Sequence, residues 1–398
     1  MQQLPNVFVV LLSFVSVDIV PNRSDFLTKP KRGVVMSSDA GGAHLASLAS
    51  ARRGLLVQVF VALILTISIG SYFWVDSRYP ALLKKLHSGK AVRLSGTLSF
   101  DALMPVAPAM PLTTRIGHTI VNWLWTNRIG MTFGICFGAA MLTLLPMLPR
   151  IRFNSAAANT LLGTVTGLPL GVCANCVAPI GRSLFNAGAS PSTVLAAMIS
   201  SPMLNVVVLA MVFTLFPLGI ALVRLAVPLA LLALVPLLAR QTSPAAEVPS
   251  LLPVAGGWVR PTAGTLKQYF KNLARLGAAT IPLMLLAALL GALVAELIPA
   301  PDIPAKVSLL GIVLVALVGT FLPVPMAFDV AASFVLMVRG VPMPYVATLL
   351  CTLGAFSVYP LLILGRTISW RTAVKLFAAV MLLGIAAGAA TAFAQHSL

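Results

Sequence analysis

Two cysteines, Cys173 and Cys176, stand between Pro169 and Pro179 in a part of the chain that is otherwise apolar enough to lie in lipid. Two thiols at this spacing can converge on one soft ion, and thiolates favour thiophilic metals and metalloids. Prolines end helices, and polar, non-helical backbone at membrane depth is tolerated only where it lines a protein cavity or a solute path. The segment, which also carries the amide of Asn175, therefore predicts the transport site of a membrane protein.

The thiol pair stands without other strong metal ligands, because none of the four histidines lies near it in the sequence. A lone pair of thiols binds more weakly than a closed four-ligand site, and a transporter must also release its cargo. Cys136, in the preceding apolar segment, is a candidate third sulfur. The alternative is that the cysteines are only small buried hydrophobic residues. We expect no resident metal and no cofactor.

Asp329 is the only acidic residue that the hydropathy pattern places at membrane depth. A buried carboxylate is costly, so burial favours the protonated form and makes Asp329 a candidate proton carrier. Arg182 is the cation that could hold it ionised instead, in a pair that either couples transport to an ion or is purely structural. Among the uncharged polar residues, we predict that Asn175 and Asn205 contact the solute, although such residues more often join helices.

The composition indicates a membrane protein, because 59% of the residues are hydrophobic, only 9% are charged and the mean hydropathy is +0.99. Soluble domains carry about 25% charged residues. The net charge of +18 comes from 27 Lys and Arg spread through the connectors, rather than along one face with aromatic residues. Charge at loop ends orients a membrane protein, so we expect a lipid bilayer and no nucleic acid as partner.

The apolar segments predict an all-α polytopic protein with about seven full spans, since roughly 20 residues are needed to cross a bilayer. Trp123 and Trp125 are predicted to lie at the membrane interface, as are Arg224 and Glu296 near span ends. The predicted spans are Leu55–Val75, Ile129–Leu148, Val194–Phe216, Leu218–Leu238, Ala278–Ile298, Tyr345–Leu364 and Ala373–Phe393.

Two further apolar segments are each interrupted near the middle by prolines, the first at Pro169 and Pro179 and the second at Pro323 and Pro325. Each half is too short to span the membrane, so the segment either crosses as one broken helix or enters and leaves on the same side as a re-entrant hairpin. Hairpins keep the Lys and Arg of the later connectors in the cytoplasm. We therefore predict two re-entrant helical hairpins.

The two halves of the chain look like copies of each other. Leu168-Pro169 recurs as Leu322-Pro323, at an offset of 154 residues that also aligns Asn175 with Asp329. We predict an inverted repeat, with repeat 1 over about 119–239 and repeat 2 over about 277–394, and with tips that meet near the midplane. Residues 1–53 are predicted to be a disordered cytoplasmic segment and 54–398 the permease domain, and a homo-oligomer is compatible with the sequence.

About forty residues around the thiol pair resemble the predicted permease family that includes the bacterial organoarsenical efflux permease. This family usually carries Cys-x-Cys, whereas this chain has Cys173-Ala-Asn-Cys176, and the second hairpin has no thiols. The resemblance implies a permease that exports a thiol-reactive metalloid, such as trivalent organic arsenic. It rests on Pro169, Cys173, Cys176, Pro179, Ser183-Leu184, Gly188-Ala189, Ala196-Ala197 and Pro202-Met-Leu-Asn205.

These observations predict a multi-pass permease of the cell inner membrane that moves a small solute or metalloid by alternating access. No nucleotide-binding motif is present, so the energy would come from an ion gradient or a partner. We do not expect an enzyme. Two alternatives remain: a membrane thiol redox enzyme that uses Cys173 and Cys176 as a dithiol, and a non-transporting subunit of a membrane complex.

Overall fold

The computed structural model describes residues 38–80, 83, 103–107, 109–148, 152–239, 258–297 and 307–396, with side chains from residue 49 onward. Within these residues every regular element is a helix. The first helix, α2, covers Ser38–Phe73 and continues as a π-helical turn over Trp74–Arg78. Residues 38–53, predicted to be disordered, are therefore helical, and the rest of that predicted segment lies outside the described residues.

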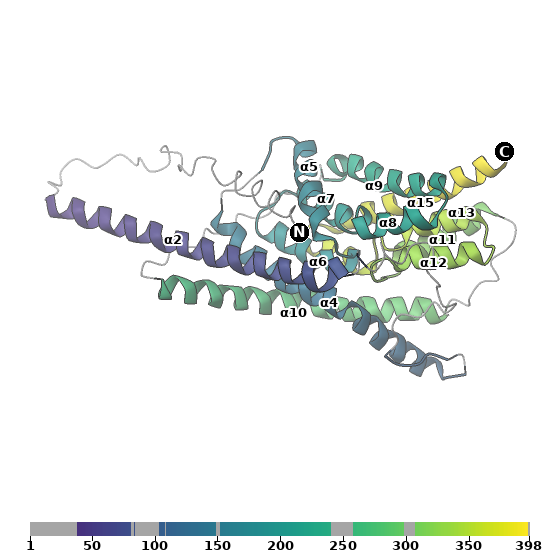
Figure 1. Cartoon of the computed structure of the whole chain (residues 1–398), viewed down its shortest axis with the longest axis horizontal. Coiled ribbons are helices and arrows are strands. Elements are labelled where there is room, and N and C mark those ends of the chain that lie inside the picture. The colour runs from purple at the N-terminus through teal and green to yellow at the C-terminus, as the bar shows by residue number, and fades with distance from the viewer. Residues whose placement is uncertain are drawn as a thin grey trace.

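In the described part of the chain, five helices are long and apolar enough to cross a membrane, and they identify a multi-pass membrane protein. The first is α2, whose apolar part with its π-helical turn covers Ala49–Arg78. The others are α4 (Leu112–Leu144), α9 (Leu218–Ala239), α10 (Val259–Leu297) and α15 (Trp370–His396). In Figure 1, α2 and α10 extend together beyond the shorter helices at one end of the molecule.

Eight shorter helices occur between the long ones along the described chain, and they come in consecutive pairs. Two of these pairs correct the predicted spans. The expected single helices Val194–Phe216 and Tyr345–Leu364 are each interrupted, the first with a bend of 43°. The pairs are α5 (Ala156–Gly167) with α6 (Ala174–Asn186), α7 (Pro191–Met203) with α8 (Val206–Leu215), α11 (Leu309–Phe321) with α12 (Phe328–Val338), and α13 (Met343–Thr352) with α14 (Val358–Thr367).

The same order of helices occurs twice along the described chain: a long helix, two short pairs and a second long helix. The first set runs from α4 to α9 and the second from α10 to α15. Contacts between the sets also correspond, since α4 packs against α10, α9 against α15, α6 against α14 and α8 against α12. The main core contains buried residues of both sets, so the two halves form one packed body.

Local sequence explains where the short helices begin and how closely they pack. Ser155 and Ser190 cap α5 and α7, because each hydroxyl accepts a hydrogen bond from a backbone N–H in the first turn. Gly163 and Gly167 face α7 so closely that a Cβ at either position would collide with its atoms. Small residues thus allow close helix contact, as in other membrane proteins.

Candidate functional site

The first predicted hairpin corresponds to α5 and α6, and the non-helical break between these helices ends at the thiol pair. Pro169 stands in a short 3₁₀ turn, and Gly171 adopts φ +55°, a left-handed conformation that favours glycine. Cys173 then caps α6, its Sγ accepting a hydrogen bond from the Cys176 N–H at 3.3 Å. The sequence therefore places both thiols at the start of a half-helix, next to non-helical backbone.

The predicted break extended to Pro179, and the structure corrects this boundary. Pro179 lies buried inside α6, because the non-helical backbone already ends at Cys173. A proline inside a helix has no N–H for the carbonyl four residues earlier, which here belongs to Asn175. Pro179 therefore leaves a backbone acceptor free of the helical ladder beside the thiol pair.

The second predicted hairpin corresponds to α11 and α12, and the non-helical break between these helices contains Pro323 and Pro325. The break ends at Ala327, which adopts φ 65°, an uncommon conformation for a residue with a Cβ. Strained backbone of this kind clusters at functional sites. Both hairpins thus break at a Leu-Pro pair and resume as helices at positions 174 and 328.

Each hairpin break is held by a tryptophan from outside the hairpin. The Trp74 indole donates to the Pro169 carbonyl, and the Trp123 indole donates to the Pro323 carbonyl, both at 2.7 Å. Trp123 is buried rather than interfacial, which corrects the prediction for this residue, whereas Trp125 is exposed. The freed carbonyls of the two breaks therefore receive donors that water cannot supply at depth.

Asn175 joins the two halves at the first hairpin tip. It is fully buried, donates from Nδ2 to the Val324 carbonyl at 3.1 Å, and accepts from the Ser357 hydroxyl at 2.8 Å. Val324 lies in the second hairpin break, and Ser357 immediately precedes α14. Asn175, which was predicted to contact the solute, thus contacts both the break between α11 and α12 and the residue that precedes α14.

Asn205 makes the corresponding connection from the first broken helix. Its Oδ1 caps α8 by accepting the Val207 N–H at 2.9 Å, and its Nδ2 lies 3.1 Å from the Met326 Sδ in the second hairpin break. Asn205 before α8 and Ser357 before α14 occupy equivalent places in the two halves. Each broken helix therefore contacts the hairpin tip of the other half through the residue that precedes its second part.

The thiol pair is buried against α4 and next to a cation. A Cβ at Gly130 would lie 2.5 Å from the Cys176 Sγ, so α4 offers glycine where the thiol approaches. Arg78 lies in the π-helical turn after α2. Its guanidinium carbon is 4.5 Å from the Phe73 ring centroid, and Phe73 stacks on Phe133 of α4. Arg78 is 8% exposed. No feature of the sequence pattern had singled it out.

Asp329 is paired with Arg224 of α9 and not with Arg182. Arg224 Nη2 lies 3.4 Å from Asp329 Oδ2, and the two side chains are 1% and 5% exposed. Arg182 is half-buried on α6, and Arg224 is deep in the protein rather than at an interface, which corrects both predictions. Glu296 forms an ion pair with Arg115. The buried pair joins α9 of the first half to α12 of the second.

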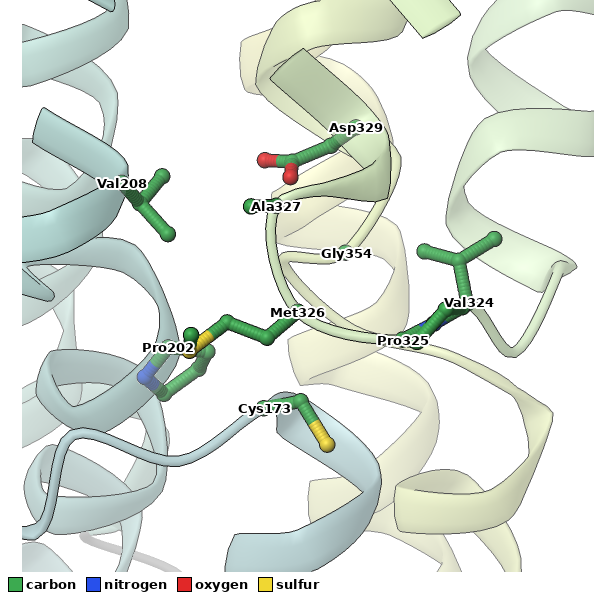
Figure 2. Close-up of a pocket in the computed structure, with 9 residues that line it drawn as sticks. All are labelled: Cys173, Pro202, Val208, Val324, Pro325, Met326, Ala327, Asp329 and Gly354. Atoms are coloured by element: carbon green, nitrogen blue, oxygen red, sulfur yellow. The ribbon is translucent and has the colours of Figure 1, made fainter. Parts of the chain in front are cut away.

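A small pocket with a cavity volume of about 10 Å³, which is room for about one water molecule, lies where these elements meet. Figure 2 shows Cys173 from α6 and Asp329 from α12 at its wall, with Met326 extending toward Pro202. The pocket brings together Cys173 and Asp329 from the two hairpins, whereas Asn175 and Asn205 lie in the contacts around it. Its lining is Cys173, Pro202, Val208, Val324, Pro325, Met326, Ala327, Asp329 and Gly354.

The described residues contain no group of three His, Cys, Asp or Glu side chains placed to hold a metal ion. Cys173 and Cys176 therefore lie together without a third such side chain from the described residues. Cys136 interacts with Tyr269 of α10 instead of joining the pair. Thiols next to freed backbone carbonyls are a ligand set that suits a small thiophilic solute, and only Cys173 of the pair lines the pocket with Asp329.

Arg224 and Ser357 were visible in the sequence but were not predicted to be site residues. Arg224 is the cation within an otherwise apolar 22-residue helix, and intramembrane cations mark functional positions. Ser357 lies 152 residues after Asn205, and Gly340 lies the same number of residues after Gly188. The repeat alignment, applied to every polar residue, would have identified Ser357 as the counterpart of Asn205.

Comparison with known proteins relates the chain to one curated relative. No family model and no solved structure matches it. The chain is similar to the UPF0718 protein YraQ of Escherichia coli (strain K12), with 26% identity over 285 residues, which are 70% of this chain and 81% of the relative. The similarity covers most of both chains, and the name of the relative gives no substrate.

Proposed function

We propose that this protein is a permease of the cell inner membrane that moves a small solute by alternating access. The observation that carries the proposal is the central pocket, where the Cys173 thiol and the Asp329 carboxyl come together from two separate hairpins. Transporters place their sites at such meeting points of discontinuous helices, because unwound backbone supplies polar groups there. The similarity to the UPF0718 protein agrees with this class of protein.

The proposed topology has two re-entrant hairpins, α5–α6 and α11–α12, that enter the bilayer from opposite faces. The helices α2, α4, α9, α10 and α15 cross without a break, and α7–α8 and α13–α14 cross as broken helices. This arrangement retains the predicted seven crossings and keeps the basic part of α10 in the cytoplasm, as the distribution of positive charge favours. The matching contacts of the two halves support an inverted repeat.

The proposed cargo is a thiol-reactive metalloid, such as a trivalent organic arsenical, and the proposed direction is efflux. An organic arsenous acid, R–As(OH)₂, binds two thiols by exchanging both As–O bonds for As–S bonds. Each thiol proton leaves with a hydroxyl group as water, so no oxidant or reductant is required. Cys173 and Cys176 are adjacent at the start of α6 and suit this exchange.

Asp329 is proposed to couple transport to a proton gradient, with Arg224 as its partner in place of Arg182. When the carboxyl is ionised, it neutralises the buried guanidinium across the two halves. When it is protonated, the attraction between α9 and α12 weakens, and the halves are free to rearrange. Loading and release of a proton at this position would therefore change the relative stability of the two access states.

The test is metalloid accumulation in a sensitive bacterium that expresses the full chain. Wild type is expected to lower accumulation of trivalent phenylarsenical, and Cys173→Ser, Cys176→Ser and Asp329→Asn are expected to abolish the effect. Cys136→Ser is the matched control, since this cysteine contacts Tyr269 and should be silent. Unchanged accumulation with wild type, at verified membrane expression, would show that the proposed cargo is wrong.

A further inference from the structure

Arg78 is a buried cation that forms no ion pair with any described side chain. Its Nε has no hydrogen-bond partner, and neither of the two ion pairs among the described side chains includes it. Among the described acids, Asp329 pairs with Arg224 and Glu296 with Arg115. Asp76, in the same π-helical turn, is exposed and belongs to neither ion pair. Contact with the Phe73 ring returns only part of the hydration free energy that a guanidinium loses on burial.

The position of Arg78 is fixed relative to the thiol pair by contacts on both sides. In the same π-helical turn, Trp74 donates to the Pro169 carbonyl of the first hairpin break. Behind Arg78, the Phe73 ring stacks on Phe133 of α4 with centroids 3.8 Å apart. π-Helical turns occur often at functional sites, where they redirect side chains. Because α4 also packs directly against Cys176, these contacts place the cation on the side of the first break where the thiol pair lies.

We propose that Arg78 binds an anionic group of the same solute whose thiophilic centre is held by Cys173 and Cys176. This inference rests on the proposed function and narrows its substrate class to thiol-reactive solutes that carry a carboxylate or a related oxyanion. A guanidinium presents its N–H groups in a planar fork that matches a carboxylate, which gives strong and directional binding. The two thiols would bind the thiophilic atom of the solute, and Arg78 would bind the anionic group attached to that atom's substituent.

The test compares two probes on the purified full-length chain in detergent: phenylarsonous acid and its 4-carboxyphenyl counterpart. Equilibrium dialysis measures the affinity for each. Wild type is expected to bind the carboxylated probe about tenfold more tightly, as one charged hydrogen-bonded contact would provide. Arg78→Met should remove this preference and leave binding of the uncharged probe intact, while Arg78→Lys should retain part of it.

Arg128→Met is the matched control, because Arg128 also lies over an aromatic ring but is exposed. It should keep the full preference, and thermal unfolding of each variant shows whether the fold is intact. Equal preference in wild type and Arg78→Met, or an equal loss for both probes, overturns the role of Arg78 while the proposed function stands. Binding that does not require Cys173 and Cys176 overturns the proposed function and, with it, this substrate class.

Discussion

The ion pair between Arg224 and Asp329 gives the sharpest prediction about what holds the two halves together. At 3.4 Å and an effective dielectric constant of about 20, Coulomb's law gives an attraction of roughly 5 kcal/mol. Removing one partner leaves the other charge buried alone, which costs about 3–5 kcal/mol. We expect Arg224→Met and Asp329→Asn each to lower the unfolding midpoint in detergent strongly.

The double variant, Arg224→Met with Asp329→Asn, removes both charges and should recover much of the loss. A coupling free energy of about 2–3 kcal/mol between the sites would confirm a direct pair, since contacting residues deviate from additivity by such amounts. Arg115→Met is the comparison at the more exposed pair with Glu296, where the expected loss is about 1 kcal/mol or less. If the two losses simply add in the double variant, the pairing is refuted.

Two further changes test the packing around the hairpin breaks. Gly130→Ala places a methyl carbon 2.5 Å from the Cys176 Sγ, so it should weaken arsenical binding and lower the free energy of unfolding by about 1–3 kcal/mol. The control is Gly117→Ala on the same helix, whose methyl group meets nothing within 4 Å and should change neither quantity. Equal effects at both positions would contradict the contact between α4 and Cys176. Trp123→Phe removes the donor to the Pro323 carbonyl and should cost about 1–3 kcal/mol in thermal unfolding, so an unchanged midpoint would mean that another donor replaces it.

Proline and repeat spacing predicted the most important parts of the architecture. The breaks at Pro169 and Pro323 follow from the inability of proline to continue a helix within an apolar segment. The offset of 154 residues aligned Asn175 with Asp329, and these are the second residues of α6 and α12 in the structure. Local chemistry was sufficient here because a helix start depends on a few neighbouring residues.

Hydropathy alone could not reveal the breaks within the third and sixth predicted spans. Asn205 and Ser357 interrupt runs that are apolar on both sides, and a window average does not register a single polar residue. Only Asn205 caps the helix that follows it. The partner of Asp329 was missed for a different reason. Arg224 is 105 residues away along the chain, so only the packing of α9 on the second half brings the charges together.

The opposed entry of the two hairpins is the claim on which the proposed transport cycle depends. Asn186 ends α6 and Val338 ends α12, and both are exposed, so each marks the outer end of one hairpin. The direct measurement is labelling of Asn186→Cys and Val338→Cys in intact cells and in inverted vesicles with a membrane-impermeant maleimide, against the parent chain. We predict that Asn186→Cys reacts only from the cytoplasmic face and Val338→Cys only from the opposite face. Reaction of both from the same face would contradict the inverted arrangement and the shared central site.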